Sequence, residues 1–258
     1  MVAVGSPVTA LTDAGLYLRG AETLLASWDA YALGSHGAAV IRSSGVAAAV
    51  FPNEPERGVY NNALLERDLG SSDRADTLDA MEAAYASAGV NRFAAWVHES
   101  DEGMRAELDR RGYTLDESTR AMGMALSDLR AARPELDGAA RDWSEYLEHL
   151  GDFGVPEGLL SGADPAAFHV LLVRSEGAVV ATGLAFDLGD DCGIYNVGTL
   201  ERARRRGIGT AVSALLAHDA ADRGCRTASL QSTAIAERVY AAVGFRDLGR
   251  ILEYGPRA

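Results

Sequence analysis

The chain has 258 residues, a formal net charge of −13 at pH 7 and 24 basic residues, all of them arginine. At this length it can bury a sizeable core, either as one large domain or as two of about 130 residues. The acidic balance argues against nucleic acid as the main partner, because duplex binding depends on cationic surface, and it suits a cationic substrate. No stretch approaches the ~18 apolar residues of a membrane span, and no secretion signal opens the sequence. We expect a cytoplasmic protein, from a bacterium with a GC-rich genome, that binds neither nucleic acid nor membrane.

The first half predicts a mixed order of strands and helices. Short apolar runs predict strands at residues 38–42, 46–51, 59–65 and 93–98, and helical spacing predicts helices at 75–88 and 104–111. Residues 119–126 close this half or open the next, and the join lies near residues 127–138. We therefore predict two domains, residues 1–128 and residues 129–258.

The second half repeats this order. Apolar runs separated by turn residues predict an antiparallel meander over residues 168–174, 178–187 and 192–200. A helix over 209–223, a strand over 226–232, a helix over 236–243 and a short strand over 250–254 follow. Cys192 and Cys225 have neither metal-ligand nor disulfide spacing, so we expect both to be buried as small apolar residues in a reducing compartment, and we expect no metal site.

The two halves also resemble each other in sequence. "GVYNNALLE" (58–66) and "GIYNVGTLE" (193–201) share five of nine positions at an offset of 135, and residues 99–115 resemble residues 231–248 at an offset of 132. This pattern is typical of an old tandem duplication.

A glycine-rich turn with three arginines follows the strand at 192–200. In "RRRGIGT" (204–210), the glycines allow close approach to the backbone, and the first amides of the next helix have no acceptor within that helix. These amides and the helix dipole build an anion site, for which we expect a diphosphate ligand. The dinucleotide fingerprint is excluded by Val212, which stands where it needs a small residue, and the Walker loop is excluded because the chain has no lysine.

The pattern Arg204-x-x-Gly207-x-Gly209 resembles the signature of the GNAT superfamily of acyl-coenzyme A-dependent N-acyltransferases. The preceding strand and the following "SLQSTAIAERVYAAVGF" (229–245) have the spacing of that family. The resemblance implies a mixed α/β (α+β) fold of two tandem GNAT-like halves, each a mostly antiparallel sheet flanked by helices. It implies acetyl-coenzyme A (acetyl-CoA) as co-substrate and a primary amine as acceptor, which would attack the thioester directly in a ternary complex.

The resemblance also implies site residues. Val197, Gly198 and Thr199 would pair with the pantetheine arm, and Thr233 or Ser232 would substitute for the asparagine that many members have in the loop before the last helix. The pyrophosphate would lie on the loop and helix start formed by Arg204, Arg205, Arg206, Gly207, Ile208, Gly209 and Thr210.

Tyr240 matches the family's general acid. A phenol is protonated at neutral pH and can donate to a departing thiolate. The second half shows no clear base: Asp187, Tyr195, Asn196 and Glu157 stay open, and the repeated Tyr195 and Asn196 are better explained as architectural.

The first half lacks the glycine pair, and Leu108 stands where the register places Tyr240. We expect it to have lost catalysis and to wall the acceptor pocket, with Trp28, Tyr31, Trp96 and His98 as lining candidates. An inactive coenzyme A-binding regulatory or interaction module is the alternative function. The sequence leaves the acceptor, the acyl chain length and the choice between monomer and homodimer open.

Overall fold

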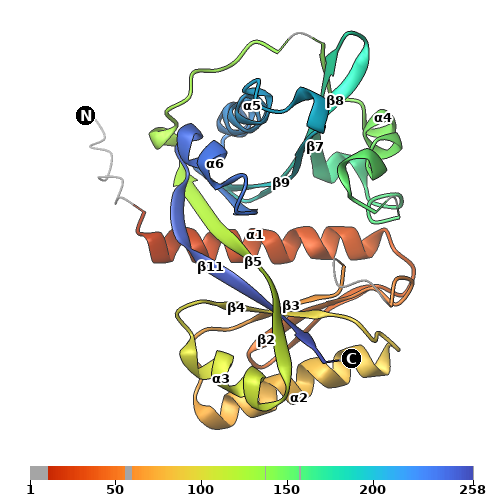
Figure 1. Ribbon diagram of the computed structural model, residues 1–258, viewed down its shortest axis with the longest axis vertical. Coiled ribbons are helices and arrows are strands. Elements are labelled where there is room, and N and C mark those ends of the chain that lie inside the picture. Colours follow the sequence, from red (N-terminus) through yellow and green to blue (C-terminus); the bar gives the residue numbers. More distant parts are fainter. Residues whose placement is uncertain (1–10, 56–59, 137, 157, 258) are drawn as a thin grey trace, which may run out of the picture.

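The computed structural model describes residues 11–55, 60–136, 138–156 and 158–257 (Figure 1). In these residues, eleven strands form one sheet in the order β1-β2-β3-β4-β11-β5-β10-β9-β8-β7-β6. The strands are β1 (Ala39–Ser43), β2 (Val46–Val50), β3 (Asn62–Leu65), β4 (Ala94–His98), β5 (Tyr113–Ala125), β6 (Ala139–Ala140), β7 (Phe168–Ser175), β8 (Ala178–Leu188), β9 (Asp191–Thr199), β10 (Thr227–Ser232) and β11 (Arg246–Pro256). The helices are α1 (Asp13–Leu33), α2 (Ser71–Ser87), α3 (Glu102–Arg110), α4 (Trp143–Glu148), α5 (Ile208–Asp222) and α6 (Glu237–Val243).

This architecture confirms the mixed α/β class and the tandem, mostly antiparallel arrangement. β7, β8 and β9 form the predicted meander. The parallel pairs are β3 with β4 and β9 with β10, one in each half. Cys192 and Cys225 are buried free thiols, as predicted. Part of the predicted strand at 59–65 lies outside the described residues, and the described strand begins at Asn62.

The two halves are joined by an exchange of strands. β11 lies between β4 and β5, and β5 lies between β11 and β10. The last strand of each half therefore pairs with the penultimate strand of the other. The undecided residues 119–126 lie almost entirely in β5, which pairs with β10 through residues 120–125. A boundary between residues 128 and 129 stays a prediction, and the hydrogen-bonded sheet continues across both halves.

Helix α1, which the sequence analysis missed, crosses one face of the sheet and contacts strands of both halves (Figure 1). The side chain of Thr12 caps it by accepting a hydrogen bond from the Gly15 amide at 3.1 Å. Leu16, Leu24 and Trp28 recur at spacings of eight and four residues and are buried. This helical spacing was present in the sequence and could have revealed the helix.

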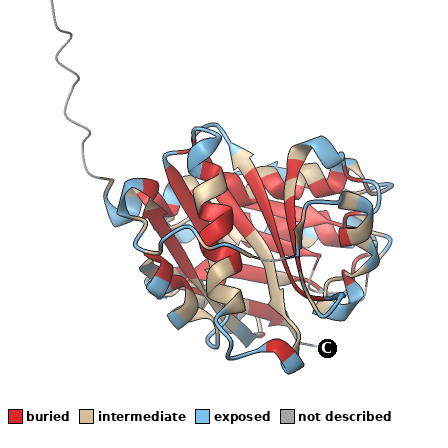
Figure 2. Ribbon diagram, turned by 90° about the horizontal axis from the view of Figure 1, so that it is seen from above, coloured by how far each residue is buried: buried red, intermediate tan, exposed pale blue. Residues whose placement is uncertain are grey.

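The opposite face of the sheet is covered separately in each half. α2 and α3 pack over the first half, and α5 and α6 pack over the second. Between these helices and α1 the strands are largely buried (Figure 2). Within the described part of the chain, no helix has both the length and the apolar character needed to cross a membrane.

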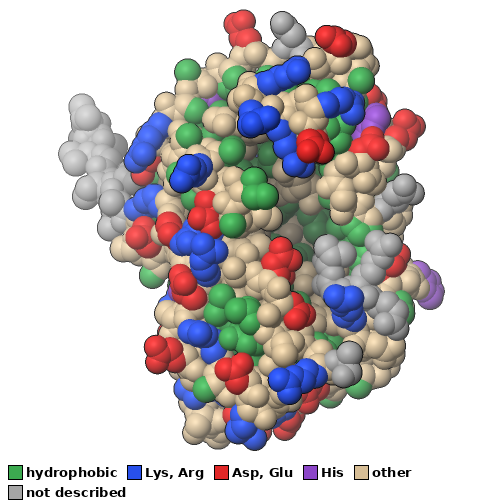
Figure 3. Space-filling view, in the orientation of Figure 1, with side chains coloured by type: hydrophobic (Ala, Val, Ile, Leu, Met, Phe, Trp, Pro, Cys, Tyr) green, Lys and Arg blue, Asp and Glu red, His purple; other side chains and the backbone are tan. Residues whose placement is uncertain are grey.

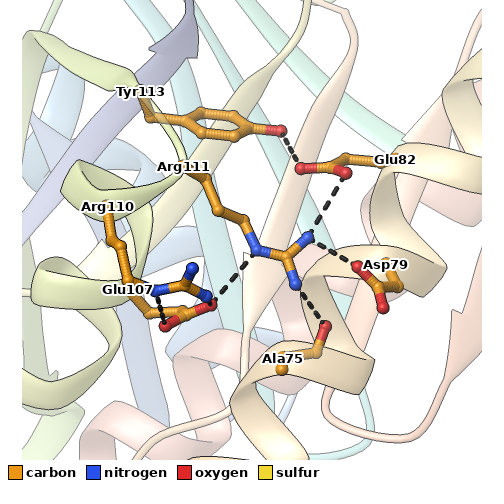
Figure 4. A network of polar contacts seen from close by, with 7 residues as sticks. All are labelled: Ala75, Asp79, Glu82, Glu107, Arg110, Arg111 and Tyr113. Carbon is orange, nitrogen blue, oxygen red and sulfur yellow. Dashed lines mark hydrogen bonds and ion pairs between the residues drawn. The ribbon is translucent and has the colours of Figure 1, made fainter.

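An arginine network ties α2 to the end of α3 (Figure 4). The Arg111 guanidinium pairs with Asp79 at 2.6 Å, with Glu82 at 3.3 Å and with Glu107 at 3.2 Å. It also donates a hydrogen bond to the Ala75 carbonyl at 2.9 Å. Arg111 thus fixes α2 and α3 against each other.

Candidate functional site

Strands β9 and β10 form a fork. They pair in parallel only from Asp191 with Thr227 to Gly193 with Ser229. Beyond Gly193, β9 bulges at Asn196, whose φ is +50°, a conformation that asparagine tolerates better than most residues. In the described residues β10 does not pair with β9 past Gly193. Gly198 and Thr199 pair with β8 on one side, and the other side of this stretch is not paired with a strand.

A buried carboxylate holds the closed end of this fork. Asp191 is 3% exposed and accepts hydrogen bonds from the hydroxyls of Thr227 at 2.5 Å and Ser229 at 2.8 Å, both on β10. It also accepts one from Thr23 of α1 at 2.7 Å. Buried charge is tolerated when it is hydrogen-bonded in this way. Asp191 therefore joins β9, β10 and α1 where the strands begin to separate.

The glycine-rich turn connects the open end of β9 to α5. Arg205 and Gly207 have φ values of +62° and +78°, and Gly207 is the N-cap of α5. No side chain caps this helix, and its first turn contains no acidic residue. The amides of Ile208, Gly209 and Thr210 have no acceptor within the helix, so this end can receive an anion.

The three arginines differ in role. Arg204 donates from Nε to the Thr199 carbonyl at 3.0 Å, which fixes the turn against β9. Arg205 and Arg206 are exposed. A Cβ added to Gly209 would lie 3.5 Å from the Thr199 hydroxyl, so β9 and the helix start are close neighbours. Basic side chains gather on the part of the surface over α5 (Figure 3).

The corresponding turn in the first half has different chemistry. α2 begins after Gly70, and Asp73 lies in its first turn, 3.2 Å from where a Cβ on Gly70 would stand. A carboxylate at a helix N-terminus is favourable for the helix and repels a second anion. This difference agrees with the expectation that the first half has lost cofactor binding.

Tyr240 lies on α6, 6% exposed, with its ring edge-on to Phe245 at 5.9 Å. Burial raises its pKa to about 12, so the phenol stays protonated at neutral pH. Within the described residues, the structure shows no hydrogen-bond partner for its hydroxyl. Glu237 anchors the helix through Arg120 and Arg250, each at 3.2 Å.

A cavity of about 680 Å³ lies between the two halves on the α1 side of the sheet. Figure 3 shows the face hollowed between its upper and lower parts. The cavity reaches the open end of the fork, because Tyr195 and Asn196 of β9 and Gln231 and Thr233 at the end of β10 line it. Its volume is in the range of small-molecule sites.

Most of the predicted wall residues line this cavity. Trp28, Tyr31 and Trp96 do so, which agrees with the proposed wall. His98 does not: its ring nitrogens contact the Ser100 hydroxyl at 2.8 Å and the Leu248 carbonyl at 2.9 Å.

The sequence analysis missed a carboxylate in this cavity. Glu253 of β11 lines it and lies opposite Glu117 of β5 in the strand register. Burial and, second, the charge of Glu117 raise the pKa of Glu253 to about 7, while a 3.4 Å hydrogen bond from the Thr119 hydroxyl opposes the rise. The available signal was a charged residue within the otherwise uncharged "ILEYG" (251–255).

Of the residues left open as bases, no described one is a carboxylate that lines this cavity. Asp187 is paired with Arg223 at 2.6 Å, near the closed end of the fork, and lines no part of the cavity. Burial raises the pKa of Tyr195 well above its usual value, and Asn196 forms the bulge; their architectural role stays a prediction. Glu157 lies outside the described residues. No group of three or more His, Cys, Asp or Glu side chains in the described ranges is placed to hold a metal ion.

The fork, the turn and the helix start coincide with a known family. The sequence model of the acetyltransferase (GNAT) family matches residues 127–245. This part of the chain belongs to the GNAT superfamily. The match contains β9, the turn, α5 and Tyr240, and it ends before β11 and Glu253. No curated protein matches the sequence.

Solved structures extend the GNAT likeness to the whole fold. A GCN5-related N-acetyltransferase from Kribbella flavida is 20% identical, with 93% of this chain and 95% of that chain covered and a TM-score of 0.67. A GCN5-related N-acetyltransferase from Sphaerobacter thermophilus is 17% identical, with 91% and 84% covered and a TM-score of 0.63. A tandem GNAT protein from the clavulanic acid biosynthesis pathway is 14% identical, with 96% of each chain covered and a TM-score of 0.56. At these identities the likeness is one of fold.

Proposed function

We propose that the protein transfers an acetyl group from acetyl-CoA to a primary amine. The observation that carries this proposal is the fork whose open strand leads through a left-handed turn into an uncapped helix start. Acetyl-CoA would supply the acetyl group as an activated thioester. The GNAT membership of residues 127–245 supports this reaction over the inactive coenzyme A-binding module.

The residues at the fork fit such a co-substrate. The open backbone edge of Val197–Thr199 can pair with an extended amide-containing arm as an added strand would. The uncapped amides at the start of α5 can receive a diphosphate, and Arg205 and Arg206 add charge at the rim. Thr233, exposed at the end of β10, is a further polar group at this site.

Tyr240 is our candidate for the general acid. Its raised pKa keeps the phenol protonated, so it can donate a proton to a departing thiolate whose ordinary pKa is about 8.5. A positioned proton donor of this kind contributes roughly 10²–10⁴ in rate. The first half has Leu108 in the corresponding place and would serve as a wall of the acceptor cavity. Action in a bacterial cytoplasm, as a monomer or homodimer without a metal, stays a prediction.

Coenzyme A binding tests the proposal through Gly207→Glu. The added side chain meets no atom within 4 Å of its Cβ, so the protein can fold around it, and its carboxylate would stand at the anion site. Each unit charge at about 4 Å costs ~1 kcal/mol in water, so two diphosphate charges predict a Kd about 30-fold higher. Calorimetry with coenzyme A at low salt measures this change.

Gly224→Glu is the matched control. Gly224 also has a positive φ and open space around it, but it lies at the other end of α5. This variant carries the same backbone strain and the same charge, and it should bind coenzyme A as the unmodified protein does. Equal affinities for the two variants, or no binding by the unmodified protein, would contradict the proposed site.

A further inference from the structure

We propose that the acceptor is a small cationic amine with an apolar or aromatic body, and that Glu253 binds its ammonium group and removes its proton. This inference rests on the proposed acetyl transfer, and it names the substrate class and the base for that reaction. It is carried by the placement of Glu253 in the cavity between the two halves.

The strand register places Glu253 in a row across three strands. Glu253 of β11 lies opposite Trp96 of β4 on one side and opposite Glu117 of β5 on the other. Directly opposed side chains on neighbouring strands have Cβ atoms about 5 Å apart. All three residues line the cavity, so two carboxylates and an indole face the same space.

Charge makes this row a cation site. Asp116, Glu117 and Glu253 are the carboxylates among the described lining residues, and Arg92 is the one guanidinium among them. From β5, Thr119 contributes a hydroxyl within 3.4 Å of Glu253, while β4 contributes the neutral Trp96 and α1 contributes neutral side chains. An ammonium group between Glu253 and Glu117 relieves the repulsion between these two carboxylates.

Aromatic rings supply the rest of the wall. Trp28 of α1 meets Trp96 edge-on, with ring centroids 5.6 Å apart, and Tyr31 continues this wall along α1. The Nε1 atom of Trp96 is buried and lacks a hydrogen-bond partner among the described residues. Aromatic faces attract cations and pack against apolar bodies, so this wall suits an amine attached to an apolar group.

The exchanged strand brings this carboxylate to the second half's site. The cavity extends from Glu253 to Asn196 and Thr233 at the mouth of the fork, where the acetyl thioester would be held. An alkyl ammonium has an ordinary pKa near 10.4, so a base is needed at neutral pH. Among the described residues of the second half, Glu253 is the carboxylate that lines this space.

The proton balance of the step is simple. The ammonium gives one proton to the Glu253 carboxylate, and the freed nitrogen forms a bond to the acetyl carbon. The carbon–sulfur bond breaks with its electron pair on sulfur, and the thiolate takes a proton from Tyr240. The amide nitrogen then loses its remaining extra proton to the tyrosinate, and Glu253 releases its proton to solvent, so each turnover releases one proton.

The test measures thiol release with purified full-length protein, acetyl-CoA and a panel of amines. The panel contains 2-phenylethylamine and tryptamine, ethanolamine as a cation without an apolar body, and phenylalanine and glutamate as carboxylate-bearing amines. We expect kcat/KM for the first two to exceed that for the amino acids at least tenfold. Preference for an amino acid would overturn the inference.

Variants test the base. Because Glu253 must be ionised to accept a proton, kcat of the unmodified protein should rise with pH through about 7. Glu253→Gln should lower kcat by roughly 10²–10⁴ and remove this inflection, with KM for acetyl-CoA unchanged. Glu117→Gln should move the inflection to lower pH, because it removes the neighbouring charge, and should raise KM for the amine, because it removes one of the two carboxylates around the ammonium. Glu22→Gln, on the exposed side of α1, is the control for loss of a surface carboxylate.

Failure of this inference can be separated from failure of the proposed function. If the protein acetylates an amine but Glu253→Gln keeps its rate and its inflection, the base assignment is overturned and acetyl transfer stands. If coenzyme A does not bind and none of the amines is acetylated, the proposed function falls and this inference falls with it.

Discussion

Glu253→Gln should have opposite effects on folding and on catalysis. In the folded protein, the cavity site raises the pKa of this carboxyl from its usual 4.5 to about 7. Burial is the main cause and the charge of Glu117 is the second. The charged form is thus less favourable in the folded protein than in the unfolded chain.

The pH dependence follows from proton binding in the two states. Between about pH 4.5 and pH 7 the folded protein holds a proton that the unfolded chain has lost, so the free energy of unfolding falls as pH rises through this window. Each pH unit of pKa difference corresponds to about 1.4 kcal/mol, which gives a cost of about 3 kcal/mol above pH 7. A neutral glutamine avoids most of this cost.

Urea denaturation at several pH values measures the effect. We expect Glu253→Gln to be more stable than the unmodified protein by about 2–3 kcal/mol at pH 8, with the difference nearly gone at pH 4.5. Glu22→Gln should show no such pH-dependent difference. A Glu253→Gln variant that is equally stable at both pH values, or less stable at pH 8, would refute the claim that this carboxyl is destabilised by its surroundings.

Two further predictions concern the fork and the candidate acid. Asp191→Leu removes the acceptor for three buried hydroxyls and should lower the free energy of unfolding by about 3 kcal/mol. Asp191→Asn keeps one acceptor oxygen and should lower it by less. If urea denaturation shows a loss below about 1 kcal/mol for the leucine variant, this role of Asp191 is contradicted. Tyr240→Phe should lower kcat by roughly 10²–10⁴ with coenzyme A affinity unchanged, and unchanged turnover across pH on an accepted amine would exclude Tyr240 as the acid.

Local features of the second half could be predicted from the sequence. The meander and α5 depend on runs of apolar residues and on glycine positions, and both can be read directly from the local sequence. The glycine-rich turn was recognisable because backbone amides at a helix start make the same anion site in any protein. The same local reasoning would have found α1, whose cap and spacing are both in the sequence.

Long-range pairing was beyond this reasoning. The sequence of residues 246–256 does not indicate that this strand inserts between β4 and β5, because strand pairing depends on which partners remain unpaired in the folded chain. The candidate bases that the sequence indicates, such as Asp187, are therefore residues close to β9 in sequence. Glu253, the base that we propose, lies instead on the last strand of the chain.

The sequence alone determined the duplication, the turn and its match to the GNAT superfamily, since these follow from residue identity and short spacing. Only the tertiary structure decided what faces the site. The exchange of β5 and β11 places Glu117 and Glu253 side by side, and α1 closes an aromatic wall over them. The partial burial of Glu253 beside the charge of Glu117 is a property of that assembly, because neither strand alone brings two carboxylates together.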